Sequence, residues 1–200
     1  MILDNIGASI GTIIGATVIA LAPTISKWWT KKSKTVFGRF NKNIATRAKI
    51  KEIIIEILHH FQAQRISIYN YHNGDYSRSG FPFDYVSIVY EEVDANTAPI
   101  IQNFQKLPIS MFTDLLESII KNRKEGYVMQ SSIATLQGDV QQQLIAYGCD
   151  TVYHFPHTHK IEDGVVSIIF ARPKTLQKEE IEWTKFKVKE LYRLQNSLHK

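Results

Sequence analysis

Three histidines in one short stretch are the residues best suited to metal chemistry. His154, His157 and His159 lie in the phrase HFPHTH. Neutral imidazoles bind zinc when they converge at about 2.0–2.1 Å from the ion. In a strand, His157 and His159 would point to the same face. A solvated turn between two strands explains the same residues without a metal, so they are candidates only, and we predict no metal site and no cofactor.

A second candidate site lies where a predicted strand over residues 65–71 meets the turn His72-Asn73-Gly74. Such a turn can present an imidazole and an amide to a ligand above the sheet. Asn and Gly also suit the positive φ angles of a tight turn, and we favour this structural role for His72. Aromatic side chains surround the turn, where they can line a pocket or form core. The candidate ligand- or partner-binding residues are His72, Asn73, Tyr69, Tyr71 and Tyr85.

Motifs of catalysis do not occur in this sequence. Neither Cys149 nor any serine lies in a GxSxG phrase, and GxxxxGK[ST], GxGxxG and HExxH are absent. Glu91 and Glu92 are adjacent in a predicted strand, so they face opposite sides of the sheet and cannot act as a paired acid and base. One of them is expected to pair with a basic neighbour. We predict that the protein is not an enzyme.

Residues 6–26 contain no charged side chain over a run of 21 residues. At about 1.5 Å per helical residue, this run spans roughly 30 Å, the thickness of the hydrocarbon core of a bilayer. Two tryptophans and a lysine cluster follow, in the order that a membrane interface favours. We therefore predict a transmembrane anchor over 1–26, with Trp28, Trp29, Lys31, Lys32 and Lys34 at the interface.

The charges that flank this run set its orientation. Asp4 precedes the run, whereas basic residues follow it. A cleaved secretory signal would carry its positive charge before the apolar stretch, although Ala20-Leu21-Ala22 resembles a cleavage site. The positive-inside rule places the N-terminus outside an inner (plasma) membrane and everything after Lys27 in the cytoplasm. The single cysteine agrees with a reducing compartment.

Gly7, Gly11 and Gly15 recur every four residues within the predicted anchor. Small residues at this spacing let two membrane helices approach closely, so this strip predicts a homo-oligomer. Glycine is also common in membrane helices in general, which is the alternative explanation.

The net charge of +5 is concentrated near the start of the chain. Residues 5–51 contain nine Lys or Arg and no Asp or Glu, whereas the remainder is slightly acidic. We interpret residues 27–49 as a basic juxtamembrane segment. Its positive charge either only keeps this part of the chain on the cytoplasmic side or also binds it to the anionic leaflet. Nucleic acid is not favoured, because only Phe37 and Phe40 are available for base stacking.

Hydrophobic periodicity predicts the elements of the remaining body, residues 50–200 together with its leading helix. A helix is expected over 43–64, strands over 65–71, 85–90, 151–155 and 165–171, a middle helix over 111–123, and a closing helix over 178–198. Ser110 is expected to cap the middle helix and Gly164 to form a hairpin bend. The closing helix offers Ile181, Phe186, Val188, Leu191, Leu194 and Leu198 for burial.

Local phrases within these elements resemble GAF-like sensor domains. RISIYNYHNG (65–74) followed by FPFDYVSIVYEEV (81–93) is similar to the two opening strands of that family. LIAYGCDTVYHFPH (144–157) and GVVSIIFARP (164–173) are similar to its later strands. The HNG turn in a small membrane-tethered chain also resembles proteins encoded by bacteriophages. No chromophore-attachment signature surrounds Cys149, and no NKFDE-type cyclic-nucleotide signature occurs.

The resemblance implies an α+β fold with an antiparallel sheet of five or six strands and flanking helices, preceded by one transmembrane helix. The first and last helices would pack on one face, and loops and the middle helix would cover the face where ligands bind. The resulting hypothesis is a membrane-anchored, non-catalytic binding or regulatory module facing the cytoplasm, with a small molecule or a protein as its partner. The alternative is a phage-encoded lysis or genome-delivery component whose glycine-spaced helix oligomerises in the bilayer.

Overall fold

The computed structural model describes residues 38–72, 84–122, 124–130, 139–156 and 164–198. The chain divides into two compact units, Met1–Ala45 and Thr46–Lys200. A leading helix covers 38–61. It is followed by β1 (Arg65–His72), β2 (Tyr85–Val93), β3 (Leu107–Pro108), the 3₁₀ turn η1 (Ile109–Phe112), α2 (Thr113–Lys121), β4 (Val128–Gln130), α3 (Asp139–Ala146), β5 (Thr151–Pro156), β6 (Val165–Phe170) and α4 (Lys178–Leu198).

The leading helix begins at residue 38 rather than the predicted 43, and it ends at residue 61 rather than the predicted 64. Ile50, Ile54 and Ile57 lie on one stripe of this helix and are buried, as the three- and four-residue spacing requires. The helix stops because Gln62 adopts a φ of 50°, and Ala63 N donates back to Leu58 O at 3.0 Å. A residue in the left-handed region followed by a backward hydrogen bond is a common helix ending.

The strands form one antiparallel sheet of six strands in the order β3-β2-β1-β6-β5-β4. The expected antiparallel α+β sheet is therefore confirmed. Two of its strands were not foreseen, the short edge strands β3 and β4. The sequence analysis also missed α3, in which four of the eight residues are polar.

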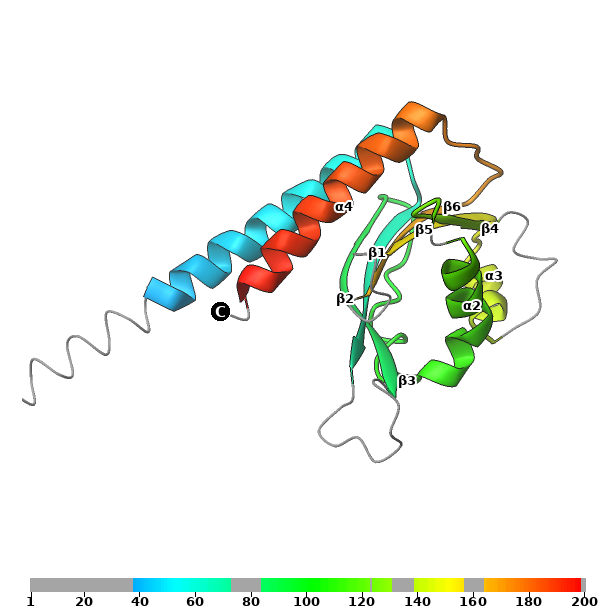
Figure 1. Cartoon of the computed structure of the whole chain (residues 1–200), viewed down its shortest axis with the longest axis horizontal. Coiled ribbons are helices and arrows are strands. Elements are labelled where there is room, and N and C mark those ends of the chain that lie inside the picture. Colours follow the sequence, from blue (N-terminus) through cyan, green and yellow to red (C-terminus); the bar gives the residue numbers. More distant parts are fainter. Residues whose placement is uncertain (1–37, 73–83, 123, 131–138, 157–163, 199–200) are drawn as a thin grey trace, which may run out of the picture. The chain divides into compact units, whose positions relative to one another are not determined.

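Residues 46–61 of the leading helix and α4 lie side by side against one face of the sheet (Figure 1). Their apolar stripes pack with Ile66, Ile68 and Phe155 from the strands. Lys187 of α4 also donates to Glu56 of the leading helix at 2.7 Å. The predicted packing of the first and last helices on one face is confirmed within residues 46–198.

The closing helix has the predicted bounds, but one predicted core residue is wrong. Phe186 is 63% exposed. The buried stripe of α4 instead runs through Ile181, Thr184, Val188, Leu191 and Gln195, and Phe186 lies between its positions. Thr184 is accommodated in the interior because its hydroxyl donates to Glu180 O at 2.7 Å, which satisfies the buried polar group.

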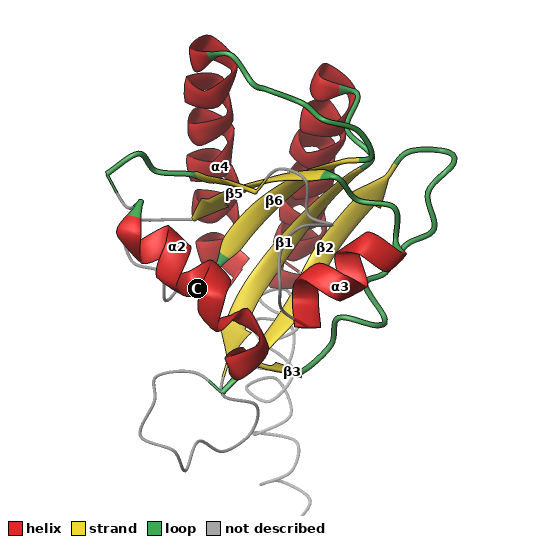
Figure 2. Cartoon of the chain, turned by 90° about the vertical axis from the view of Figure 1, so that its right-hand side faces the viewer, coloured by secondary structure: helices red, strands yellow, loops and turns green. Residues whose placement is uncertain are grey.

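The second face of the sheet is covered by α2, α3 and the segment 97–105 (Figure 2). The predicted middle helix is in fact η1 followed by α2. The predicted cap by Ser110 is wrong, because Ser110 lies inside η1, and α2 begins after Phe112 without a side-chain cap. Phe112, Leu115 and Ile119 point from this layer into the core against the sheet.

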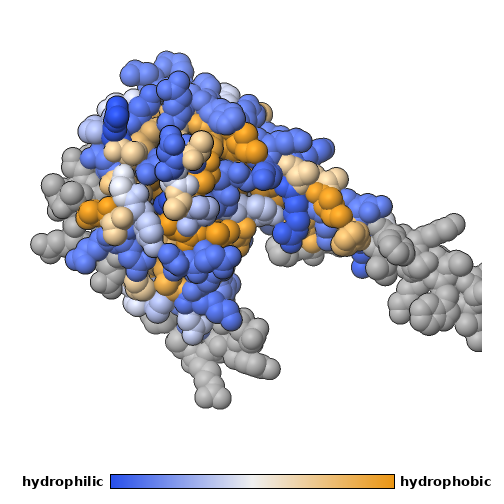
Figure 3. Space-filling model, turned by 180° about the vertical axis from the view of Figure 1, so that it is seen from behind, coloured by the Kyte–Doolittle hydropathy of each residue, from blue (hydrophilic) through white to orange (hydrophobic). Residues whose placement is uncertain are grey.

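The side of the molecule drawn in Figure 3 is largely hydrophilic, with apolar side chains in small groups. Among the described residues of the strands and the helices α2 to α4, the large apolar side chains that are exposed are Val89, Ile120, Met129, Ile145 and Phe186. Isolated apolar residues of this kind are ordinary on protein surfaces.

Candidate functional site

Four polar residues form a row across the sheet on the face covered by α2 and α3. His154 of β5 lies opposite Ser167 of β6, Ser167 lies opposite Ser67 of β1, and Ser67 lies opposite Glu91 of β2. The two serines are fully buried, and His154 is 3% exposed. We call these four residues the polar row. Its position in the middle of an otherwise apolar face makes it the candidate site.

A bulge in β2 brings Glu91 into the polar row. The register of β1 and β2 shifts between Ile68 and Tyr69, so that Val89 has no partner. Ile88 consequently packs on the α2 and α3 side, whereas Tyr90 packs against the leading helix and α4. Without the extra residue, strict alternation would place Glu91 on the other face.

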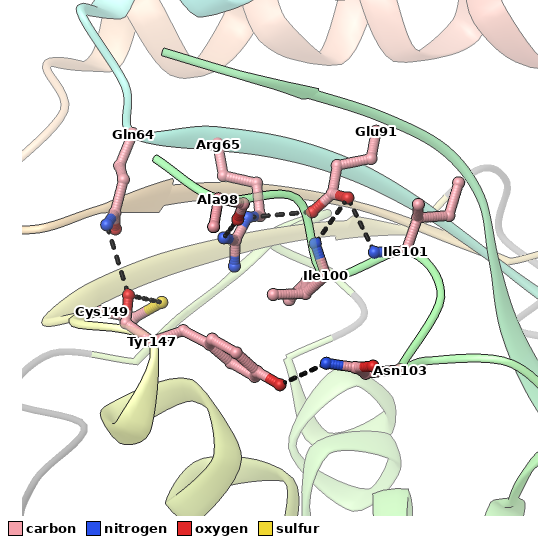
Figure 4. A network of polar contacts seen from close by, with 9 residues as sticks. All are labelled: Gln64, Arg65, Glu91, Ala98, Ile100, Ile101, Asn103, Tyr147 and Cys149. Atoms are coloured by element: carbon pink, nitrogen blue, oxygen red, sulfur yellow. Dashed lines mark hydrogen bonds and ion pairs between the residues drawn. The ribbon is translucent and has the colours of Figure 1, made fainter. Parts of the chain in front are cut away.

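Glu91 forms a buried ion pair with Arg65 (Figure 4). Arg65 Nε lies 2.9 Å from Glu91 Oε1, and the two side chains are 1% and 2% exposed. Arg65 Nη2 donates to Ala98 O at 2.7 Å, and the amides of Ile100 and Ile101 donate to Glu91 Oε2 at 2.9 and 2.8 Å. The pair therefore binds the segment 97–105 to the sheet.

The other glutamate of this strand points the opposite way. Glu92 lies 3.3 Å from Lys51 of the leading helix. The two adjacent glutamates therefore face opposite sides, and each has its own cation. Glu91 and Glu92 therefore do not form a carboxylate pair with each other.

His154 is held between two neutral partners. Its Nδ1 lies 2.8 Å from Ser167 Oγ, and its Nε2 lies 3.1 Å from Gln130 Oε1. Because Oε1 only accepts, Nε2 carries the proton and Nδ1 accepts from the serine hydroxyl. Burial lowers the pKa of His154 to about 3, because a charged imidazolium is disfavoured away from water. His154 is therefore a neutral hydrogen-bonding group at physiological pH.

A small cavity of about 10 Å³ lies beside His154. Such a volume holds about one water molecule. Its walls are mostly apolar and come from the strands β1, β2, β5 and β6 and from η1, α2 and α3. The lining residues are Tyr69, Tyr71, Val86, Phe112, Leu115, Leu144, His154 and Val165.

The two tyrosines that line this cavity and the buried thiol of Cys149 are also neutral at physiological pH. Burial raises the pKa of Tyr69 and of Tyr71 above the usual value for tyrosine. Burial also raises the pKa of the Cys149 thiol to about 11, although Arg65 opposes this shift. A thiol with a raised pKa is a poor nucleophile at neutral pH. Cys149 therefore contributes to the core rather than to covalent chemistry.

The structure divides the predicted ligand-binding residues between the two faces of the sheet. Tyr69 and Tyr71 line the cavity. His72 and Tyr85 are paired in register and stack with ring centroids 6.0 Å apart, and His72 Nε2 lies 2.8 Å from Ser87 Oγ. Strand alternation places these two rings on the opposite face from Tyr71. Asn73 lies outside the described residues.

The remaining predicted sites fall on segments that the structure does not describe. These are the membrane-helix residues Gly7, Gly11 and Gly15, the interface residues Trp28 to Lys34, and the histidines His157 and His159. Within the described ranges, no group of three metal-ligating side chains comes together. None of the helices in those ranges combines the length and the apolar character needed to cross a bilayer.

Sequence reasoning missed Arg65, Ser67, Ser167 and Gln130. The two serines were detectable in principle, because each interrupts an apolar strand, in RISIY and in VVSIIF. A polar residue at an inward position of a buried strand is an informative exception. Nothing local in the sequence indicated that the serines face each other.

The comparisons with known proteins concern the fold. No protein-family model matches this chain, and no curated protein matches it. A far-red cyanobacteriochrome photoreceptor has a TM-score of 0.60 at 9% identity, over 84% of this chain and 98% of that chain. The GAF domain of PixJ from Thermosynechococcus elongatus, in its blue-light absorbing form, has a TM-score of 0.57 at 13% identity, over 79% and 89% of the two chains.

A third solved structure agrees with these two. The domain GAF3 of Slr1393 from Synechocystis sp. PCC6803, in its photoproduct state, has a TM-score of 0.55 at 15% identity, over 76% of this chain and 96% of that chain. The described body of the protein therefore has the GAF fold, as the resemblance of its strands implied.

The neutral state of His154 predicts how stability depends on pH. The unfolded chain binds a proton at His154 near pH 6.5, whereas the folded chain does so only near pH 3. This contribution to stability is complete above pH 6.5 and is lost as pH falls toward 3, by up to about 1.4 kcal/mol per pH unit. Urea unfolding of the full chain at pH 7, 6 and 5 measures the slope. We expect a shallower slope in His154→Gln, and an equal slope would contradict this assignment.

Proposed function

We propose that this protein is a non-catalytic binding module that holds a small molecule between the sheet and the layer formed by α2 and α3. The observation that carries the proposal is the buried polar row beside an apolar cavity. Apolar walls with a few placed hydrogen-bonding groups are typical of small-molecule sites. The GAF fold adds support, because the solved structures named above include photoreceptors. The likeness between those proteins and this chain is one of fold alone.

Binding requires the cavity to open. A space of about 10 Å³ admits nothing larger than a water molecule. Of the described part of α3, only Leu144 is a buried apolar anchor, whereas α2 and η1 contribute Phe112, Leu115 and Ile119. Because Leu144 is the one buried apolar anchor among the described side chains of α3, 142–146, we propose that α3 moves when the ligand enters. The open form is a minor state that the ligand stabilises.

Native mass spectrometry of the full chain tests this proposal. We expect a bound small molecule on the protein purified from its natural source. Leu144→Phe should reduce its occupancy at least about tenfold, because the larger side chain fills the cavity. Ile145→Phe is the matched control, since Ile145 is the next residue of α3 and is 37% exposed. The absence of any bound molecule, or equal occupancy in the two variants, would contradict the proposal.

Membrane attachment is a separate part of the proposed function. We propose that residues 1–26 anchor the module with its body on the cytoplasmic side, and that Gly7, Gly11 and Gly15 pair the anchors. The support is the uncharged run and the basic residues that follow it. Protease protection in intact cells tests the topology. Digestion of the body from outside the inner membrane would overturn it.

A further inference from the structure

The described groups around the candidate site are electrically balanced. Arg65 is the one cation buried on this face among the described residues, and Glu91 already lies 2.9 Å from it. His154 is neutral, and both of its nitrogens have neutral partners. The strand β6 contributes Ser167 and apolar residues, and β4 contributes Gln130. Among the described residues, a charged ligand would therefore meet no unmatched opposite charge.

The covering helices do not change this balance. The charged residues of α2 are Asp114, Glu117 and Lys121, and all three are exposed, whereas Leu115 and Ile119 face the sheet. The described side chains of α3, from Gln142 to Ala146, are uncharged. Asp94 and Lys106, at the two ends of the segment that crosses this face, are exposed as well. The charges of these elements remain in water.

Arg65 nevertheless has an unused hydrogen-bond donor. Its Nη1 is buried and has no acceptor among the described residues. A second anion at this position would lie close to the Glu91 carboxylate, where like charges repel strongly in a medium of low dielectric. A neutral oxygen or ring nitrogen accepts the same hydrogen bond without that repulsion. Such an acceptor also removes the cost of an unsatisfied buried donor.

We infer that the ligand of this site is an uncharged molecule with an apolar body, rather than a phosphate- or carboxylate-bearing one. This inference rests on the proposed function, because it concerns the same site. Apolar cavity walls bury the body of the ligand, and the neutral groups of the polar row recognise its polar edge. An ionised ligand would lose its hydration, and the described residues of this face offer no unpaired cation to replace it.

The test identifies the charge of the molecule that the protein carries. The full chain is purified natively and denatured, and the released molecule is analysed by mass spectrometry and by electrophoretic mobility at pH 7. The Leu144→Phe and Ile145→Phe variants are treated in parallel. We expect a molecule with zero mobility that is at least about tenfold depleted from Leu144→Phe and retained by Ile145→Phe.

The outcomes separate the two proposals. A released molecule that carries an ionised phosphate or carboxylate, and that depends on Leu144 in the same way, overturns this inference and leaves the proposed function standing. A chain that carries no molecule overturns the proposed function and the inference with it. A neutral molecule retained equally by both variants overturns the inference, because the molecule then binds elsewhere.

Discussion

Replacing Arg65 by Met is expected to lower the free energy of unfolding by about 3–5 kcal/mol. The change leaves the Glu91 carboxylate buried without its cation, and it removes the hydrogen bond from Arg65 Nη2 to Ala98 O. A loss of this size is a large part of the total stability of a typical domain, about 5–15 kcal/mol. Urea unfolding of the full chain at neutral pH measures the difference.

Lys51→Met is the matched control for this experiment. It removes the cation that pairs with the adjacent glutamate, Glu92, but Lys51 is 61% exposed. Exposed ion pairs contribute about 0–1 kcal/mol, so the control should change stability little. The double variant Arg65→Met with Glu91→Leu should regain part of the loss, because it leaves no charge unpaired. Equal losses for Arg65→Met and Lys51→Met would show that the buried pair has no special role.

Replacing Gly164 by Ala is expected to lower the free energy of unfolding by about 2–4 kcal/mol. Gly164 has a φ of 124°, a backbone conformation that residues other than glycine rarely adopt. An added Cβ would also overlap the carbonyl oxygen of Tyr69. Because that carbonyl belongs to β1, relief of the overlap would disturb the start of the β1 and β6 pairing. Thermal and urea unfolding of the full chain measure the effect.

The variant Gly148→Ala separates the cost of a positive φ angle from the cost of the steric overlap with Tyr69. Gly148 also has a positive φ, 72°, but the nearest atom to an added Cβ is Gln64 Nε2 at 3.8 Å. The control should therefore cost only the left-handed conformation, about 1–2 kcal/mol. A Gly164→Ala variant that is no less stable than Gly148→Ala would contradict the close approach to Tyr69.

Secondary structure was largely predictable from the sequence where the periodicity was strong. The closing helix Lys178–Leu198 has the predicted bounds, and the four long strands lie where alternation or apolar runs placed them. The edge strands β3 and β4 and helix α3 were missed because they are short, with two, three and eight residues. Their conformation depends on the neighbours that pair with them or pack on them, which local pattern does not report.

The candidate site also depends partly on local sequence pattern and partly on contacts between distant segments, and here the second part is larger. The sequence by itself determined that Tyr69, Tyr71 and the serines lie in buried strands, because apolar runs require burial. Only the tertiary structure decided which of these residues meet. The bulge at Val89 turns Glu91 toward Arg65, and the sheet order sets Ser67 beside Ser167 and Ser167 beside His154. The physical reason is that register and strand order depend on contacts between segments up to about a hundred residues apart, whereas hydrophobic pattern records only whether each residue is buried.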